Sequence, residues 1–232
     1  MQQRMASPAR QASRLEAVRV VPTRLPRTAA YQRWGKRAFD LAVAVTLLVM
    51  AAPVILALAG LVVLTSGWPA FYGAPRLGKG GRPFRMWKLR TMVNGANAML
   101  EEWKRDGHPI GEMHRNGLKP TTDPRSTKLG GYLRRLSLDE LPQLWNVALG
   151  QMTLVGPRPY AADELDQVPG AGGRILAVRP AITGPWQTRG RNQLPIRQRI
   201  EMDIDWVRST TFWGDLRCLA RTLSPLFSMD GR

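Results

Sequence analysis

Cysteine, histidine and acidic residues are scarce in this chain. Its 232 residues include one cysteine, Cys218, and two histidines, His108 and His114. One cysteine cannot form an intrachain disulfide, and this set is too small for a zinc site, so a reducing, cytoplasm-facing environment is expected. Asp and Glu total 17 against 34 Lys and Arg, which gives a formal charge of +17. This excess predicts an anionic partner: nucleic acid, an acidic membrane surface or a phosphorylated substrate.

The N-terminal residues, 1–32, are expected to form a disordered basic arm. They carry Arg, Pro, Ser and Ala with little apolar periodicity. Because no apolar core follows the first charges closely, the arm does not have the pattern of a signal peptide.

One long apolar run, from Leu41 to Leu64, contains no charged residue and only Thr46 as a polar one. It is long enough to cross a hydrocarbon core of about 30 Å as a helix. Pro53 lies near its middle and predicts a kink, because proline removes a backbone donor. Basic residues flank both ends, and such residues favour the cytoplasmic side. We therefore predict a membrane-inserted re-entrant hairpin over residues 33–66, broken at Pro53, with a straight crossing as the alternative.

The remaining residues, 67–232, are expected to form a cytosolic catalytic domain. The fold class expected is α+β, mostly helical, with a small β-hairpin and interfacial amphipathic helices. Strand patterns cover residues 70–72 and 84–89, and residues 106–125 are expected to be a mobile loop. Helical patterns cover residues 94–104, 132–149, 196–207 and 211–223. The last of these has an apolar side, which is typical either of a core helix or of a helix in the headgroup layer.

Two adjacent carboxylates stand out in the string LSLDELPQL. One interpretation is a capping box, in which Ser137 caps a helix and Glu140 bonds back to it. That arrangement puts Pro142 at the fifth helical position, where its ring clashes, and it leaves Asp139 without a role.

The alternative interpretation of these carboxylates is chemical. A helix N-terminus with Arg134 and Arg135 close by would keep Asp139 ionised and attract phosphate. Asp139 could then attack phosphorus, and Glu140 could hold a magnesium ion, which prefers carboxylate and phosphate oxygens.

Basic residues beside proline or glycine, or on a strand, form a further group of candidate phosphate ligands. Arg158 lies between Pro157 and Pro159, which fix the backbone around a guanidinium suited to bidentate phosphate binding. The alternative for this string is an ordinary surface turn. Four other candidates are Lys88, Arg90, Arg125 and Arg191. For the strand pair, Lys88 and Arg90, a solvated strand face is the simpler interpretation, and no P-loop or Rossmann motif is present.

Four strings closely resemble, taken together, the bacterial sugar transferase family: KRAFDLAVAV, APRLGKGGRPFRMWKLRTM, TDPRSTKLGGYLRRLSLDELPQLWNVALGQMTLVGPRP and VRPAITGPWQTRGRN. This family comprises monotopic phosphoglycosyl transferases that act on polyprenyl phosphate. The resemblance runs from about Lys36 to Leu223. Among its members, the chain looks like the exopolysaccharide-initiating galactose or glucose type.

The resemblance implies a reaction in which a sugar 1-phosphate moves from a UDP-sugar to undecaprenyl phosphate and UMP is released, with Mg²⁺ as cofactor. Asp139 matches the family's nucleophile, which forms an aspartyl-phosphosugar, and Glu140 matches its partner at the metal. Arg134 and Arg158 match the arginines at phosphate. The resemblance also implies a re-entrant helix in the bacterial inner membrane, with the catalytic domain on the cytoplasmic face.

The chain departs from the family pattern at several positions. Ala52 precedes Pro53 where serine is usual, Ala181 stands where glycine is common, and Trp206 replaces tyrosine. These changes leave the reaction class intact and the identity of the sugar open.

Two other functions compete with the enzyme: a non-catalytic membrane scaffold of polysaccharide assembly, and a membrane-tethered nucleic-acid-binding protein. Neither a helix-turn-helix nor an RNP-like string is present. We therefore expect membrane lipid as a partner and no nucleic acid, and we leave a homodimer open.

Overall fold

The computed structural model describes residues 31–115, 120, 123–166, 168–189 and 194–227. The predicted arm lies outside this range except for its last two residues, and so does the candidate Arg191.

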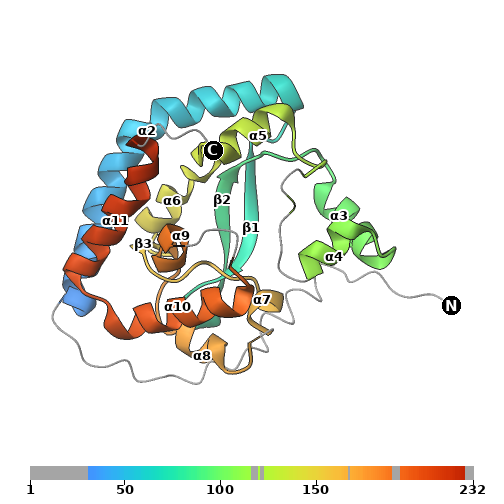
Figure 1. Ribbon diagram of the computed structural model, residues 1–232. Helices are drawn as coiled ribbons and strands as arrows, with labels where there is room; N and C mark the ends of the chain where they lie inside the picture. Colours follow the sequence, from blue (N-terminus) through green and yellow to red (C-terminus); the bar gives the residue numbers. More distant parts are fainter. Residues whose placement is uncertain (1–30, 116–119, 121–122, 167, 190–193, 228–232) are drawn as a thin grey trace.

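The longest element is helix α2 (Lys36–Ser66), which follows a short π-helical turn, η1 (Tyr31–Gly35). Figure 1 shows α2 as two legs that meet at a bend, and the helix contains Pro53. The chain stays helical across the bend, as expected where a proline ring kinks a helix without unwinding it. By length and composition α2 could cross a membrane, and only 17% of its most apolar stretch is buried in the protein. An apolar helix that the protein leaves uncovered indicates association with a membrane.

Both ends of α2 are bound by the rest of the protein. Near its start, the Nζ atom of Lys36 lies 2.6 Å from a carboxylate oxygen of Asp215. At its end, Arg90 donates to the backbone carbonyl of the last residue, Ser66, at 2.7 Å and also to that of the next residue, Gly67. The exposed large side chains lie between these anchors: Leu41, Val45, Leu47, Val49, Met50, Val54, Leu56, Leu61 and Leu64.

The predicted β-hairpin is present. Strands β1 (Phe71–Leu77) and β2 (Pro83–Leu89) pair antiparallel, and the turn η2 (Lys79–Gly81) joins them. Gly80 has a φ of 72°, a conformation in which glycine carries no steric cost. β1 is longer than the prediction, because its pairing with β2 continues past Gly73 to Leu77.

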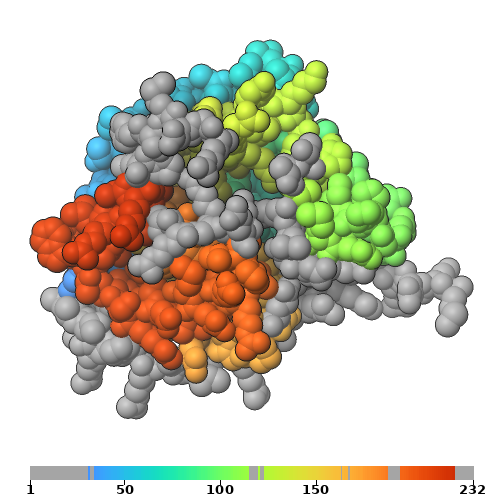
Figure 2. Space-filling model, in the orientation of Figure 1, coloured from blue at the N-terminus to red at the C-terminus, as the bar shows by residue number. Residues whose placement is uncertain are grey.

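Helices make up most of the remainder, which confirms a mostly helical protein. In chain order they are α3 (Ala96–Arg105), α4 (Pro109–Arg115), α5 (Lys128–Arg135), η3 (Leu138–Glu140), α6 (Gln143–Ala148), α7 (Ala162–Asp166), α8 (Ala171–Ile175), α9 (Pro185–Arg189), α10 (Ile196–Ser209) and α11 (Phe212–Phe227). On the face seen in Figure 2, α10 and α11 lie to one side, and α3 and α4 lie to the other.

Two of the predicted segments need correction. The loop predicted over residues 106–125 contains α4, a short helix that packs against α3. The helix predicted over residues 132–149 is divided into α5, η3 and α6. The division begins at Ser137, whose φ of 57° is left-handed and interrupts a right-handed helix.

A second pair of strands was not predicted. β3 (Thr153–Val155) and β4 (Ala181–Thr183) lie parallel, and both have mostly buried residues. Each is too short to show an alternating pattern in the sequence. The strands bring Gly156 and Gly184 so close that a Cβ on Gly184 would lie 2.2 Å from the carbonyl oxygen of Gly156. The main core lies where the first leg of α2 meets the hairpin, α6, β3 and α11, around Ala44, Ala74, Met86, Val147, Met152 and Val155.

Candidate active site

Asp139 and Glu140 lie in η3, the 3-10 turn between α5 and α6. The side chain of Ser137 makes no capping hydrogen bond, so the capping-box interpretation is wrong. Pro142 stands at the position just before α6, where its missing N–H costs that helix no internal hydrogen bond. The turn therefore accommodates the proline and leaves both carboxylates available for contacts with other segments.

Lys88 from β2 reaches the two carboxylates. Its Nζ atom lies 2.5 Å from Oε1 of Glu140 and 3.8 Å from Oδ2 of Asp139. The side chain of Asp139 is 7% exposed, whereas that of Glu140 is 39% exposed. The dyad thus combines one enclosed carboxylate with one that is partly exposed to solvent.

The electrostatics of Asp139 differ from the prediction that its surroundings keep it ionised. Burial raises the pKa of Asp139 above the ordinary value, and the charges of Lys88 and Arg134 oppose that rise only in part. The adjacent Glu140 raises the pKa further. The ionised form of Asp139 therefore depends on the two neighbouring cations.

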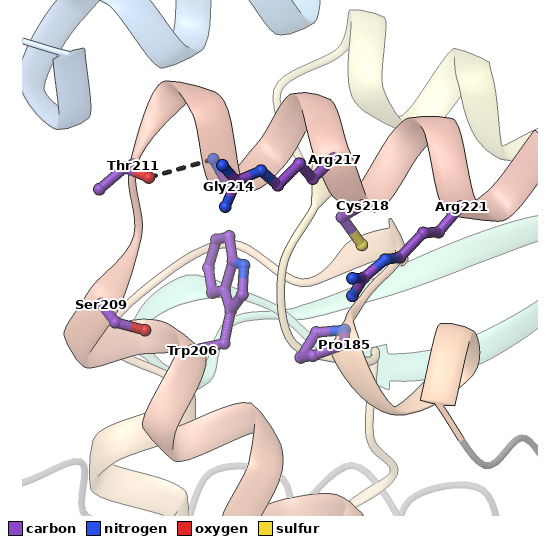
Figure 3. Close-up of a pocket in the computed structure, with 8 residues that line it drawn as sticks. All are labelled: Pro185, Trp206, Ser209, Thr211, Gly214, Arg217, Cys218 and Arg221. Atoms are coloured by element: carbon purple, nitrogen blue, oxygen red, sulfur yellow. Dashed lines mark hydrogen bonds between the residues drawn. The ribbon is translucent and has the colours of Figure 1, made fainter.

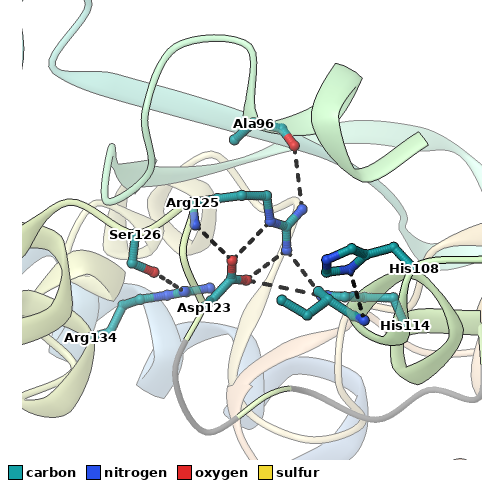
Figure 4. Close-up of polar contacts among 8 residues, drawn as sticks. Ala96, His108, His114, Asp123, Arg125, Ser126 and Arg134 are labelled. Atoms are coloured by element: carbon teal, nitrogen blue, oxygen red, sulfur yellow. Dashed lines mark hydrogen bonds and ion pairs between the residues drawn. The ribbon is translucent and has the colours of Figure 1, made fainter. Parts of the chain in front are cut away.

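Arg134, in the last turn of α5, donates to the hydroxyl of Ser126 at 3.0 Å. Figure 4 shows the carboxylate of Asp123 between this guanidinium and that of Arg125. The charge of Arg134 lowers the pKa of both Asp123 and Asp139. The structure thus places this predicted phosphate ligand within electrostatic reach of the dyad, exposed to solvent.

Arg125 is in a closed network instead. It is 1% exposed and binds both oxygens of Asp123, at 2.9 and 2.6 Å. It also contacts Nε2 of His114 at 2.9 Å and donates to the carbonyl of Ala96 at 3.3 Å (Figure 4). Its contacts give Arg125 a structural task, and its role toward phosphate stays a prediction.

Arg90 lies away from the face that the strand pattern predicted. β2 ends at Leu89, so the alternation that would align Arg90 with Lys88 stops one residue too early. The guanidinium of Arg90 donates to backbone carbonyls just after α2, including that of Trp68 at 3.1 Å. Arg90 therefore secures the end of α2, and a role toward phosphate stays a prediction.

Arg158 belongs to a second cluster, built by the loop that follows β3. The neighbouring prolines, Pro157 and Pro159, are buried. The guanidinium of Arg158 lies 3.8 Å from Glu164 and 5.6 Å from the centre of the Trp186 ring. Among the described residues, Arg158 forms no ion pair or hydrogen bond with Asp139 or Glu140, so it remains a predicted substrate ligand.

Sequence reasoning missed Asp203 of α10, which fixes this loop. One oxygen of Asp203 accepts from the backbone N–H of Arg158 and from the hydroxyl of Tyr160, both at 2.9 Å. Burial raises the pKa of Asp203 to about 7, against the lowering effect of these hydrogen bonds. The sequence contains one sign of this role: Asp203 lies on the apolar side of a helical pattern, between Ile200 and Val207, where an acidic residue is unusual.

No group of three or more His, Cys, Asp or Glu side chains gathers into a metal site among the described residues. The adjacent carboxylates of Asp139 and Glu140 are the acidic oxygens nearest Lys88. Magnesium is commonly held by one or two carboxylates together with substrate phosphates and water, and the dyad fits that pattern.

The family model described as bacterial sugar transferase matches residues 31–229. The chain is 38% identical over 189 residues to the exopolysaccharide production protein ExoY of Sinorhizobium fredii, covering 82% of this chain and 84% of that protein. It is 38% identical to the UDP-glucose:undecaprenyl-phosphate glucose-1-phosphate transferase of Caulobacter vibrioides, covering 89% and 74%.

A longer relative is the undecaprenyl-phosphate galactose phosphotransferase of Salmonella typhimurium. The identity is 36%, and the match covers 86% of this chain but only 42% of that protein. The part shared by all three relatives includes the dyad, the loop around Arg158 and most of the chain after the arm. With its family model covering the described residues from end to end, the chain belongs to the bacterial sugar transferase family and is a sugar-phosphate transferase.

Proposed function

We propose that this protein transfers a hexose 1-phosphate from a UDP-sugar to undecaprenyl phosphate, releasing UMP, as the first membrane step of exopolysaccharide synthesis. The reactions named for the relatives support the substrate classes. The observation that carries the mechanism is the enclosed carboxylate of Asp139 beside Lys88, Glu140 and the charge of Arg134.

Two displacements at one phosphorus atom account for the transfer. In the first, an oxygen of Asp139 bonds to the phosphorus next to the sugar, and the bond from that phosphorus to the bridging oxygen breaks. The electron pair leaves with UMP. In the second, a phosphate oxygen of undecaprenyl phosphate attacks the same phosphorus and Asp139 departs as a carboxylate. Lys88 and Arg134 stabilise the ionised nucleophile and attract the anionic substrates.

Magnesium is part of the proposal, held by Glu140 with or without an oxygen of Asp139. When bound, the ion would offset the negative charge that builds on the phosphate oxygens. Oε1 of Glu140 bonds to Lys88, so metal binding at this oxygen would exchange one cation for another. We expect Glu140→Gln to raise the Mg²⁺ concentration for half-maximal rate by about tenfold. An unchanged metal requirement at full rate would remove Glu140 from this role.

We also propose that α2 is re-entrant and that the catalytic domain lies on the cytoplasmic face of the inner membrane. The support is that one folded body holds both ends of α2, through Asp215 at Lys36 and Arg90 at Ser66. A straight crossing would put those ends about 30 Å apart on opposite sides of the membrane. The bend in α2 gives the chain a way to return (Figure 1).

Label transfer tests the reaction. Membranes containing the protein are incubated with undecaprenyl phosphate and a panel of UDP-sugars labelled in the sugar. We expect label in the organic-soluble lipid fraction for one hexose, with one UMP formed per transfer. A non-catalytic scaffold would give neither product.

Cysteine labelling tests the topology. Because Cys218 is the only cysteine and is buried, a Cys218→Ser background permits single reporters at positions 33 and 82. In intact cells with an opened outer membrane, an impermeant maleimide should label neither reporter, and lysis should expose both. Labelling of position 33 alone from outside would favour a straight crossing.

A further inference from the structure

A hollow of about 230 Å³ lies between α10 and α11 (Figure 3). Its lining includes Trp206, Ser209, Thr211, Arg217, Cys218 and Arg221. The dyad is in η3, between α5 and α6, and none of these elements lines the hollow. The space is small for a whole nucleotide and fits a phosphate with a few further atoms.

The two arginines give the hollow its chemistry. Arg217 and Arg221 are one helical turn apart on α11, so they extend from the same side of the helix. Neither has a hydrogen bond or an ion pair within the part of the chain that the structure describes. The carboxylate closest to them in sequence, Asp215, is buried and engaged by Lys36 and Tyr31. The arginines are therefore available to an outside anion, and guanidinium groups suit phosphate best.

Two large apolar side chains of α11 are exposed close to the lining arginines. Trp213, one helical turn before Arg217, is 67% exposed, and Leu216, which directly precedes Arg217, is 41% exposed. The same helix packs on the first leg of α2 through a ring contact between Phe212 and Phe39, at 5.6 Å. Two arginines in a hollow, on a helix that also exposes Trp213 and Leu216 and packs beside a helix suited to a membrane, favour an amphiphilic anion over a free one.

We propose that this hollow binds the phosphate of an anionic phospholipid headgroup, such as phosphatidylglycerol, and anchors α11 to the membrane surface. Arg217 and Arg221 hold the phosphate, and the hydroxyl of Thr211 has a proton free to donate, since its oxygen is used as acceptor by the N–H of Gly214 at 3.1 Å. Trp213 and Leu216 then lie against the first carbons of the acyl chains. The site is separate from the reaction at Asp139 and does not depend on the proposed substrates.

The test uses the full-length protein in a zwitterionic detergent. Native mass spectrometry measures binding of a short-chain phosphatidylglycerol. The matching phosphatidylcholine, which is zwitterionic with no net charge, tests whether the anionic headgroup is required. Inorganic phosphate tests whether a free anion binds as well. The variant is Arg217→Gln with Arg221→Gln. The matched control, Arg82→Gln with Arg105→Gln, removes the same charge from two exposed residues elsewhere. Melting temperatures confirm that all proteins are folded.

We expect one saturable phosphatidylglycerol per chain, weakened about tenfold in the α11 variant and unchanged in the control. Equal weakening in both variants would overturn the proposal, because net charge alone would then explain binding. Phosphate binding without phospholipid binding would overturn the lipid assignment. Loss of sugar transfer by the α11 variant in lipid-free detergent would show instead that the hollow serves a substrate.

Discussion

Arg134 lowers the pKa of two aspartates, Asp123 and Asp139, that belong to two different clusters of charged side chains. The two clusters differ in how closely their charged groups are paired. In the closed cluster, Asp123 uses both oxygens on Arg125, and Arg125 is 1% exposed. In the open cluster, Lys88 bonds closely to Glu140, but Asp139 lies 3.8 Å from the same amine. The ion pair of the first cluster is short, whereas the contact of Asp139 with Lys88 in the second is long.

This difference distinguishes charged groups that stabilise the fold from a charged group that is suited to react with a substrate. Breaking a buried ion pair leaves the remaining partner uncompensated, so the closed cluster stabilises the fold around α4 and α5. The enclosed carboxylate of Asp139 has no ion pair as short as that of Asp123, and only the 3.8 Å contact with Lys88 and the charge of Arg134 oppose the cost of its burial. It gains most from a substrate that brings its own charge and metal.

The strongest test of the comparison is Asp139→Asn. We expect sugar-phosphate transfer to fall by at least about a thousandfold, because the amide cannot form the phosphosugar ester. Thermal stability should be retained or raised, since burial raises the pKa of this carboxyl and the amide carries no charge to desolvate. UMP release in the absence of acceptor should vanish as well. A normal burst of UMP from this variant would exclude Asp139 as the nucleophile.

The matched change in the closed cluster is Asp123→Asn. It should cost about 3 kcal/mol of unfolding free energy, because Arg125 would be left buried without its counter-ion. Although burial opposes it, the Arg125 guanidinium holds the pKa of Asp123 below its ordinary value. The stabilisation is therefore present above the ordinary aspartate pKa and is lost as the pH falls below it. Denaturant unfolding as a function of pH measures both, and activity lost without a change in stability would reverse the assignment of the two clusters.

The segments that the sequence predicted well are those with local causes. The apolar run with Pro53 predicts a bent α2, and two short strand-like runs on either side of a glycine-rich loop predict the hairpin of β1 and β2. The dyad was found because two acids in an apolar string need an explanation. The long-range partners of the closed cluster were not found, since His114 comes from a segment expected to be a loop. Arg125 could not be told from Arg134 without them.

The second sheet and Asp203 were missed for a related reason. β3 and β4 have three residues each, too few for a periodic pattern. Asp203 accepts hydrogen bonds from Arg158 and Tyr160, which lie more than 40 residues earlier in the sequence. These contacts form only when α10 packs against the loop after β3, so the sequence alone does not indicate them. A side chain whose task lies in contacts with distant segments, as that of Asp203 does, therefore gives little signal in the sequence.

Asp203 is a third carboxylate with a different set of contacts. One of its oxygens accepts two hydrogen bonds, and the other is buried without a hydrogen-bond partner in the described part of the chain. Its pKa of about 7 lies above the unfolded value, so its contribution to stability is present at low pH and is lost as the pH rises toward 7. We expect unfolding free energy to fall by about 2–3 kcal/mol from about pH 5 to about pH 8, relative to Asp203→Asn. The asparagine oxygen can still accept both hydrogen bonds. Parallel pH profiles for the two proteins would mean that Asp203 does not titrate in this range.

The smallest expected effect concerns Ser126, the residue that links the two clusters by holding Arg134. We expect Ser126→Ala to lower kcat by about fivefold, since one hydrogen bond to a charged group is lost. It should also move the acidic limb of the pH–rate profile upward, because a less ordered Arg134 lowers the pKa of Asp139 less. In an Arg134→Gln background, Ser126→Ala should have no further effect on either quantity. Additive losses in that double variant would mean that Ser126 acts through the fold of α5 and not through Arg134.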